Sequence, residues 1–200
     1  ARAGGAFGQD ALVGGAIVTL DNPCNGAVQG ARAARARDNI ESSLHAASEW
    51  GSDEAALAEA HAAIGQAHIV IATVLFVDDH VGRIMPALEA RREQCDAMVC
   101  LMSAGEIVRL TRMGNYRMDA PAKGPLALLK KLRGSNKRGS ASSGAGQMKM
   151  LRRLPKILRF IPGTAQDVRA YFLTLQYWLS GSDENVVAMV RALKIGRAHV

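Results

Sequence analysis

The amino-acid sequence predicts an α/β fold, with a Rossmann-like or flavodoxin-like parallel sheet of about four strands followed by an amphipathic helical segment. Strand-like and helix-like segments alternate along roughly the first hundred residues, as in a parallel sheet with crossover helices. Residues 69–76 are apolar except for Thr73, and a strand that is apolar on both faces is typical of a sheet centre. The later part of the chain changes to helical spacing of apolar residues.

The first strand is expected at residues 16–20, a short apolar run that turn-forming residues at 21–23 end. An Ala- and Arg-rich segment at 26–38 follows, and its composition favours a helix. Residues 40–46 alternate roughly between apolar and polar side chains, which indicates a second, weaker strand.

Ser52 is a suitable N-cap for the next helix, whose apolar face repeats at helical spacing as far as Ala67. The third strand, 69–76, leads into a helix whose apolar side chains fall within 81–88. Pro86 interrupts that pattern, so it either kinks the helix or occupies the first turn of a helix that begins later.

A fourth strand is expected at 97–101, and Ser103 is expected to cap a helix that extends to Met113. The pattern does not fix the order of the strands in the sheet. The α/β domain is therefore assigned to residues 16–120, and a helical extension to residues 121–193.

The helical extension begins with a short helix and continues through a Gly- and Ser-rich segment, residues 133–147, that is expected to be a flexible loop. Thr164 is expected to cap a helix with one apolar stripe, and Gly181 is a natural stop for it. The helices of the extension are expected at 125–132, 148–161, 164–179 and 182–193.

Both ends of the chain are set aside from the fold. Residues 1–15 are rich in Gly and Ala without a useful period, and are expected to be non-native or disordered. Residues 194–200 resemble the translation of a sequencing adapter and are interpreted as an artefact.

Composition is that of an ordinary globular protein, with 48% apolar and 22% charged residues. No apolar run approaches the roughly 18 residues of a membrane span. The cysteines Cys24, Cys95 and Cys100 lack metal-ligand spacing and are interpreted as reduced thiols, which predicts a cytoplasmic protein.

Positive charge is concentrated between residues 120 and 166, where the chain has no Asp or Glu. Such a block could attract nucleic acid. However, aromatic side chains are not interleaved with the Lys and Arg residues, so the stacking platforms of single-strand binders are missing. No nucleic-acid partner is therefore predicted, and a solvated loop and helix face is the preferred interpretation.

Asp78, Asp79 and His80 follow the strongest strand, where ligands gather in open α/β sheets. Two carboxylates and an imidazole could hold a metal ion, but adjacent residues on an extended chain point in opposite directions. The pattern also lacks the order of acidic residues that a phosphoryl-accepting site requires. Capping of the next helix is therefore the preferred interpretation.

A polar crevice is the remaining possibility, because the ends of neighbouring parallel strands meet at one edge of the sheet. Its predicted binding residues are Asp21, Asn22, Asp78, Asp79, His80 and Ser103. No phosphate-binding glycine motif, nucleophile elbow or paired-histidine motif is present, so no catalytic residue and no metal ligand is predicted.

Several stretches, in order along the chain, resemble the N-terminal region of the magnesium chelatase large (H) subunit of the bacteriochlorophyll pathway. The resemblance covers about residues 17–193, and residues 147–187 are its most specific part. The stretches include VTLDN, IVIATVLFVDDH, CDAMVCLMSAGEIVRLTRMG and GAGQMKMLRRLPKILRFIPGTAQDVRAYFLTLQYWLSGSDENV. The strength of the resemblance lies in its length rather than in any one motif.

The resemblance implies a part in the ATP-dependent insertion of Mg²⁺ into protoporphyrin IX, an early step toward chlorophylls in photosynthesis. The implied partners are the remaining domains of the same subunit, the AAA+ subunits that hydrolyse ATP, and protoporphyrin IX. The chain would be a non-catalytic head fragment that binds no cofactor itself. Two alternatives remain open: a relative of the cobaltochelatase large subunit, and a stand-alone α/β ligand-binding module.

Overall fold

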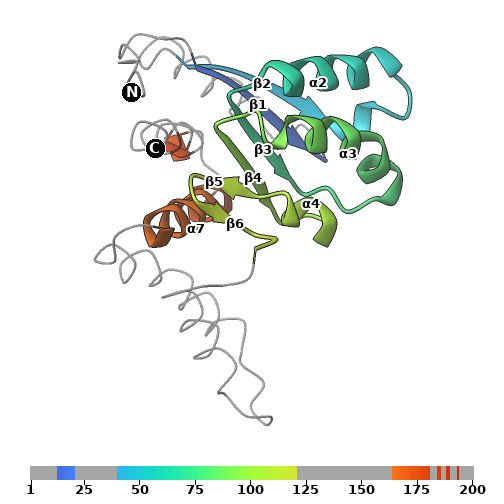
Figure 1. Ribbon diagram of the computed structural model, residues 1–200. Helices are drawn as coiled ribbons and strands as arrows, with labels where there is room; N and C mark the ends of the chain where they lie inside the picture. The colour runs from blue at the N-terminus through green and yellow to red at the C-terminus, as the bar shows by residue number, and fades with distance from the viewer. Residues whose placement is uncertain are drawn as a thin grey trace, which may run out of the picture.

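The computed structural model describes residues 13–20, 40–120 and 164–180, together with residues 184, 185, 188, 189 and 193. Its elements are β1 (Val13–Thr19), β2 (Ile40–Ala46), η1 (Ala47–Glu49), α2 (Glu54–Gln66), β3 (Ile69–Thr73), α3 (Asp78–Arg92), β4 (Ala97–Leu101), α4 (Gly105–Arg109), β5 (Arg112–Met113), β6 (Tyr116–Arg117) and α7 (Thr164–Ser180) (Figure 1). The predicted helices at 26–38, 125–132 and 148–161 and the loop 133–147 lie outside the described residues.

Among the described residues, the sheet has six strands in the order β2-β1-β3-β4-β5-β6. The first four run parallel, and β5 and β6 are antiparallel additions at one side. In this order β1 lies between β2 and β3, which is the flavodoxin-like arrangement rather than the Rossmann one. The predicted α/β class with a mainly parallel sheet is confirmed.

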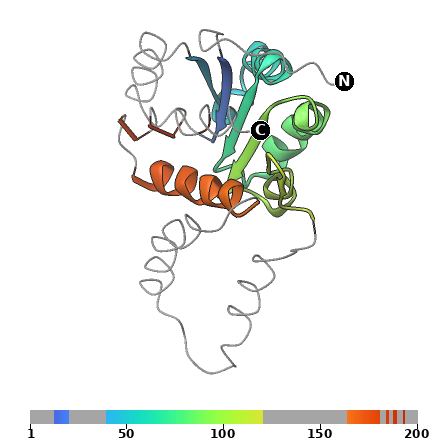
Figure 2. The same cartoon turned by 60° about the vertical axis from the view of Figure 1, so that its left-hand side comes forward.

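Helices cover both faces of the sheet (Figures 1 and 2). One face packs against α2 and α3, which contribute the fully buried side chains of Ile64 and Ile84. The other face packs against α7 through Tyr171, with the buried side chains of Met189 and Leu193 in the same cluster. Strand β3 alternates between the two layers and is buried along its whole length, as its apolar sequence predicts.

Strand β1 begins at Val13, three residues before the predicted start. Glycines at the next two positions carry no side chain, so the pattern of apolar residues does not indicate a strand there. The backbone is nonetheless paired, and the Gly14 N–H donates to His68 Nδ1 at 3.1 Å. Strand β3 ends at Thr73, earlier than predicted, because the chain turns sharply at Val74.

The predicted helix from Ser103 to Met113 is wrong in its second half. Helix α4 ends at Arg109, and the chain then forms the β5–β6 hairpin. The buried Thr111 explains the change, because its hydroxyl accepts from the Cys100 N–H and donates to the Cys100 carbonyl at 3.1 and 3.3 Å. These bonds draw the chain back against β4.

The helix starts also differ from expectation. The N-cap of α2 is Asp53 rather than Ser52, and its carboxylate accepts from the N–H groups of residues 55 and 56. Helix α3 is continuous from Asp78, so Pro86 lies in its interior rather than in its first turn.

The hairpin is tied to α7 through Asp167. Its carboxylate accepts from the Asn115 N–H at 3.0 Å, so this residue of α7 holds a turn that lies 52 positions away along the chain. Burial raises the pKa of Asp167, and backbone hydrogen bonds from Asn115 and Tyr116 partly offset that effect. Gly114 lies directly beneath this carboxylate with φ +53.

Cys95 and Cys100 are free thiols, and both are buried, whereas Cys24 lies outside the described residues. Burial raises the pKa of Cys100 to about 12, so this thiol stays protonated at neutral pH. Among the described helices, none combines the length and apolar character that crossing a membrane would require.

Candidate functional site at the carboxyl edge of the sheet

The carboxyl ends of β1 and β3 meet where the strand order changes direction. In open α/β sheets this position is the usual place for a ligand. The described residues of the predicted crevice, Asp78, Asp79, His80 and Ser103, all follow β3 or β4 at this edge. Asp21 and Asn22 lie outside the described residues.

Two loops at this edge are bound to each other. The Val74 N–H donates to the Met102 carbonyl at 3.0 Å, and the Ala104 N–H donates to the Leu75 carbonyl at 2.8 Å. The loop after β3 and the loop after β4 therefore form one unit.

The Ser103 side chain joins these two loops. Its hydroxyl accepts from the Leu75 N–H at 3.1 Å and donates to the Leu101 carbonyl at 3.0 Å. The predicted role as a helix cap is wrong, since Ala104 occupies the N-cap of α4 and no side chain caps it. With both hydrogen bonds made within the protein, Ser103 acts as a structural residue here.

Both loops contain a strained residue. Val74 has φ 58 and Met102 has φ 44, which is the left-handed region that side chains with a Cβ rarely adopt. Each such residue costs about 1–3 kcal/mol and persists only where its surroundings enforce it. Here the enforcing contacts are the cross-loop hydrogen bonds and the fully buried anchor Leu75.

The same loops expose large apolar side chains. Phe76 is 56% exposed, Val77 47% and Met102 46%, whereas the neighbouring Leu75 is fully buried. Successive residues at this edge therefore either anchor the core or present apolar groups to solvent.

The Asp78-Asp79-His80 triplet does not converge on a common point. Asp78 and Asp79 are exposed in the first turn of α3, where they interact favourably with the helix dipole. Val77 is the N-cap and no side chain caps the helix, so the predicted capping hydrogen bond is absent. Within the described part of the chain, no cluster of three or more His, Cys, Asp or Glu residues could hold a metal ion.

His80 instead packs edge-on against Trp50, with ring centroids 5.9 Å apart. His80 Nδ1 and Trp50 Nε1 are both buried without a hydrogen-bond partner. This pair could not be foreseen, because Trp50 follows β2 and joins His80 only through the sheet order.

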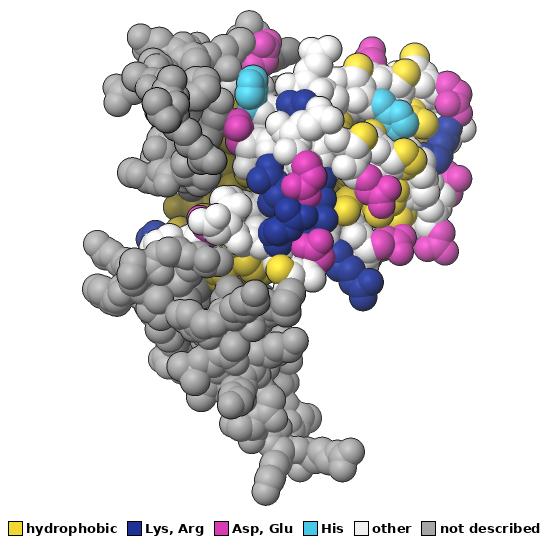
Figure 3. Space-filling view, viewed as in Figure 1, with side chains coloured by type: hydrophobic (Ala, Val, Ile, Leu, Met, Phe, Trp, Pro, Cys, Tyr) yellow, Lys and Arg dark blue, Asp and Glu magenta, His cyan; other side chains and the backbone are white. Residues whose placement is uncertain are grey.

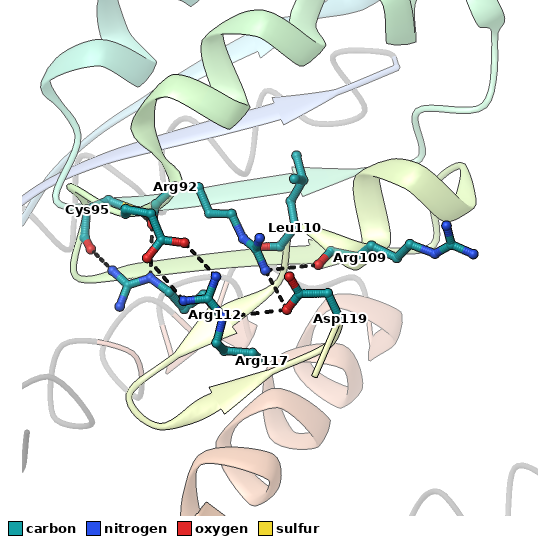
Figure 4. Close-up of polar contacts among 8 residues, drawn as sticks. Arg92, Cys95, Arg109, Leu110, Arg112, Arg117 and Asp119 are labelled. Carbon is teal, nitrogen blue, oxygen red and sulfur yellow. Dashed lines mark hydrogen bonds and ion pairs between the residues drawn. The ribbon is translucent and has the colours of Figure 1, made fainter. Parts of the chain in front are cut away.

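An arginine cluster at the opposite end of α3 was also missed (Figures 3 and 4). Arg92 donates to the Leu110 carbonyl at 3.0 Å and pairs with Asp119 at 2.8 Å. Arg112 donates to the Arg92 carbonyl at 2.9 Å and to the Cys95 carbonyl. The only hint in the sequence is the basic last turn of the helix, since cations favour a helix C-terminus.

The cluster is structural rather than a binding site. Its guanidinium groups are occupied by backbone carbonyls at the ends of α3 and α4, which include those of Arg92 and Leu110. The Arg92 guanidinium lowers the pKa of Asp119, and a hydrogen bond from Arg117 lowers the pKa of Glu93. The cluster therefore fastens α3 to the β5–β6 hairpin.

The geometry defines the described part of the molecule as a flavodoxin-like α/β domain whose loops after β3 and β4 are joined by backbone hydrogen bonds. Comparison with known proteins then gives the family. The chain belongs to the family described as "Domain of unknown function (DUF3479)", whose model matches residues 16–172.

Named relatives extend this finding. The chain is 49% identical over 180 residues to the magnesium-chelatase H subunit of Cereibacter sphaeroides, a match that covers 89% of this chain and 15% of that protein. It is 49% identical over 183 residues to the H subunit of Rhodobacter capsulatus, covering 90% of this chain and 15% of that protein. It is 32% identical over 135 residues to the chloroplastic magnesium-chelatase subunit ChlH of Oryza sativa subsp. indica, covering 66% of this chain and 9% of that protein. The chain thus spans only about 15% of the length of its bacterial relatives.

Proposed function

We propose that this chain is the N-terminal head of the porphyrin-binding subunit of a magnesium chelatase. The supporting observation is the 49% identity to a bacterial magnesium-chelatase H subunit along 89% of this chain. The whole enzyme would insert Mg²⁺ into protoporphyrin IX, with ATP hydrolysed by AAA+ partner subunits. The compartment we propose is the cytoplasm, which the free thiols of Cys95 and Cys100 support.

Within that enzyme we assign the chain a non-catalytic role. The described residues contain no cluster able to hold a metal ion, and Ser103 at the sheet edge is already fully engaged in loop contacts. The chelation step is assigned to regions of the subunit that this chain does not cover. The α/β domain would instead provide a folded platform at the head of the larger protein.

A chimeric H subunit tests this role. The corresponding region of the Cereibacter sphaeroides H subunit would be replaced by residues 13–193 of this chain. Mg-protoporphyrin fluorescence would then be followed with the AAA+ subunits, ATP and Mg²⁺. We expect the chimera to retain activity, and the isolated chain to produce no Mg-protoporphyrin under the same conditions.

Two outcomes would contradict the proposal. The first is a soluble, folded chimera without activity, which would show that this chain cannot replace the matching region of the H subunit. The second is Mg-protoporphyrin formed by the isolated chain, which would show that the chain is catalytic. The unmodified H subunit is the positive control.

The two alternatives make different predictions. A relative of the cobaltochelatase large subunit would support activity when it replaces the matching region of a cobaltochelatase, but not when it replaces that of the magnesium enzyme. The relatives reported above all carry the magnesium chelatase name. A stand-alone ligand-binding module would have a stop codon shortly after residue 193. A longer genomic read is expected to show an open frame that continues well past that residue.

A further inference from the structure

We propose that the carboxyl edge of β3 and β4 is a docking surface for a protein partner that presents apolar side chains within a basic rim. This surface, here named the edge patch, has an apolar centre and a rim of carboxylates. It consists of Phe76, Val77 and Met102 with Asp78, Asp79 and Glu106. The proposal goes beyond the chelatase role and does not depend on it.

The apolar centre is built from two loops rather than from scattered residues. Phe76 and Val77 come from the loop after β3, and Met102 comes from the loop after β4. The backbone bond from Val74 to Met102 holds these loops side by side. Single exposed apolar residues are common, but three large ones gathered on joined loops are typical of an interaction site.

The backbone keeps the centre exposed. Val74 and Met102 are the described residues other than glycine with a left-handed conformation, and they occupy equivalent places after β3 and β4. Relaxation of either residue would break the cross-loop bonds. The apolar side chains are therefore presented by a fixed framework, which lowers the entropic cost of binding.

The rim determines the charge of the partner. Asp78 and Asp79 lie in the first turn of α3, and Glu106 lies in the first turn of α4. The ion pairs found among the described residues use Glu54, Glu93 and Asp119 instead. The edge patch thus repels phosphate groups and anionic membranes, and it is complementary to a basic protein surface.

A designed ligand tests the patch directly. A fluorescein-labelled amphipathic helical peptide of Leu and Lys would be titrated with the full chain, with anisotropy as the readout. We expect saturable binding that the double variant Phe76→Ser/Met102→Ser weakens by about tenfold or more. The Asp78→Asn/Asp79→Asn variant should weaken binding and reduce its dependence on salt.

Matched controls separate the edge patch from general stickiness. Leu179→Ser removes a large apolar side chain that is 43% exposed on α7 and should leave binding unchanged. A peptide of Leu and Glu with the same apolar face should bind at least about tenfold more weakly. Urea unfolding of each variant checks that it is folded. If Phe76→Ser/Met102→Ser is unstable, the exposed pair variant Asp78→Asn/Asp79→Asn tests the edge patch instead.

Three results would overturn the proposal. The first is equal peptide binding by the wild type and the edge-patch variants. The second is equal binding of the Leu/Glu and Leu/Lys peptides. The third is self-association of the wild type, detected by sedimentation and abolished by Phe76→Ser/Met102→Ser, because it would make the occupant a second copy of the chain.

Discussion

At Gly114, both the backbone conformation and the packing require a residue without a side chain. Its φ is +53, and a Cβ built there would lie 2.9 Å from Asp167 Oδ1. Both the left-handed conformation and the carboxylate above it exclude a side chain. Since Asp167 also accepts from the next N–H in the turn, the glycine allows α7 to approach the hairpin.

We predict that Gly114→Ala lowers the free energy of unfolding by about 1–3 kcal/mol, measured by urea denaturation. Gly82→Ala is the matched control, because Gly82 lies inside α3 and, apart from the neighbouring residues and the local helix backbone, nothing lies within 4 Å of the position that a Cβ would take. This control should instead stabilise the protein by about 0.5–1 kcal/mol. Equal effects at the two positions would contradict the argument.

Asp167 should give stability a pH dependence of unusual sign for a carboxyl. Burial raises its pKa in the folded protein, so between 3.8 and that raised value the folded state binds more protons than the unfolded state. Stability contributed by this group is therefore present at low pH and is lost as pH rises through the window.

The variant Asp167→Asn isolates this effect, because an amide oxygen still accepts from the Asn115 N–H but does not titrate. We predict that the unfolding free energy of the wild type, relative to the variant, falls as pH increases above 3.8 and then levels off. Urea denaturation at a series of pH values measures the difference. Parallel pH profiles for the two proteins would contradict the prediction.

At the scale of elements, the arginine cluster joins α3 to the hairpin. Arg112→Met should lower the free energy of unfolding by about 1–3 kcal/mol, because the carbonyls of Arg92 and Cys95 lose a charged donor. Arg109→Met is the control, since only its backbone carbonyl takes part in the cluster, and it should change stability by no more than about 0.5 kcal/mol. Urea denaturation of both variants compares them, and a similar loss in both would argue against the carbonyl contacts.

The elements with long apolar runs were predictable, and the short ones were not. Strands β3 and β4 were identified because burial on both faces leaves an unambiguous sequence. Strands β5 and β6 have two residues each, too few for any period to appear. Their position depends on the buried contact of Thr111 with Cys100, which sequence spacing does not reveal.

The location of the candidate site was predictable in the same partial way. Parallel strands predicted that Asp78, Asp79, His80 and Ser103 would follow strand ends at one edge, and they do. What each side chain does there depends on loop conformation. No sequence pattern indicates the left-handed conformation of Met102. The hydrogen bonds of Ser103 between the loops and the exposure of the apolar centre of the edge patch could therefore not be inferred.

For the whole molecule, the central question is whether α7 belongs to the same cooperative unit as the sheet. Tyr171 is buried in the cluster that covers one sheet face, and Asp167 bonds to the hairpin. Without α7, that face would expose apolar side chains of several strands, including Ile17, Ile71 and Val99. We therefore expect the sheet and α7 to unfold together.

The two tryptophans of the chain provide the measurement, because Trp50 packs in the core cluster that includes α3 and Trp178 lies in α7. With 5-fluorotryptophan incorporated, fluorine NMR follows the two sites in one wild-type sample. We predict that both native resonances disappear at the same urea concentration. A lower midpoint for Trp178 alone would show that α7 detaches first.

The joined loops after β3 and β4 also set an order for folding. Pairing of β3 with β4 joins segments close in sequence, whereas β1 must find β3 across a much longer span, so the former has the lower loop-closure cost. The strained conformations of Val74 and Met102 are offset by the cross-loop hydrogen bonds, which can form only when β3 and β4 are in register. These turns should therefore form after the transition state. Met102→Gly removes the Cβ that strains this turn, so it should change the unfolding rate far more than the refolding rate in stopped-flow experiments.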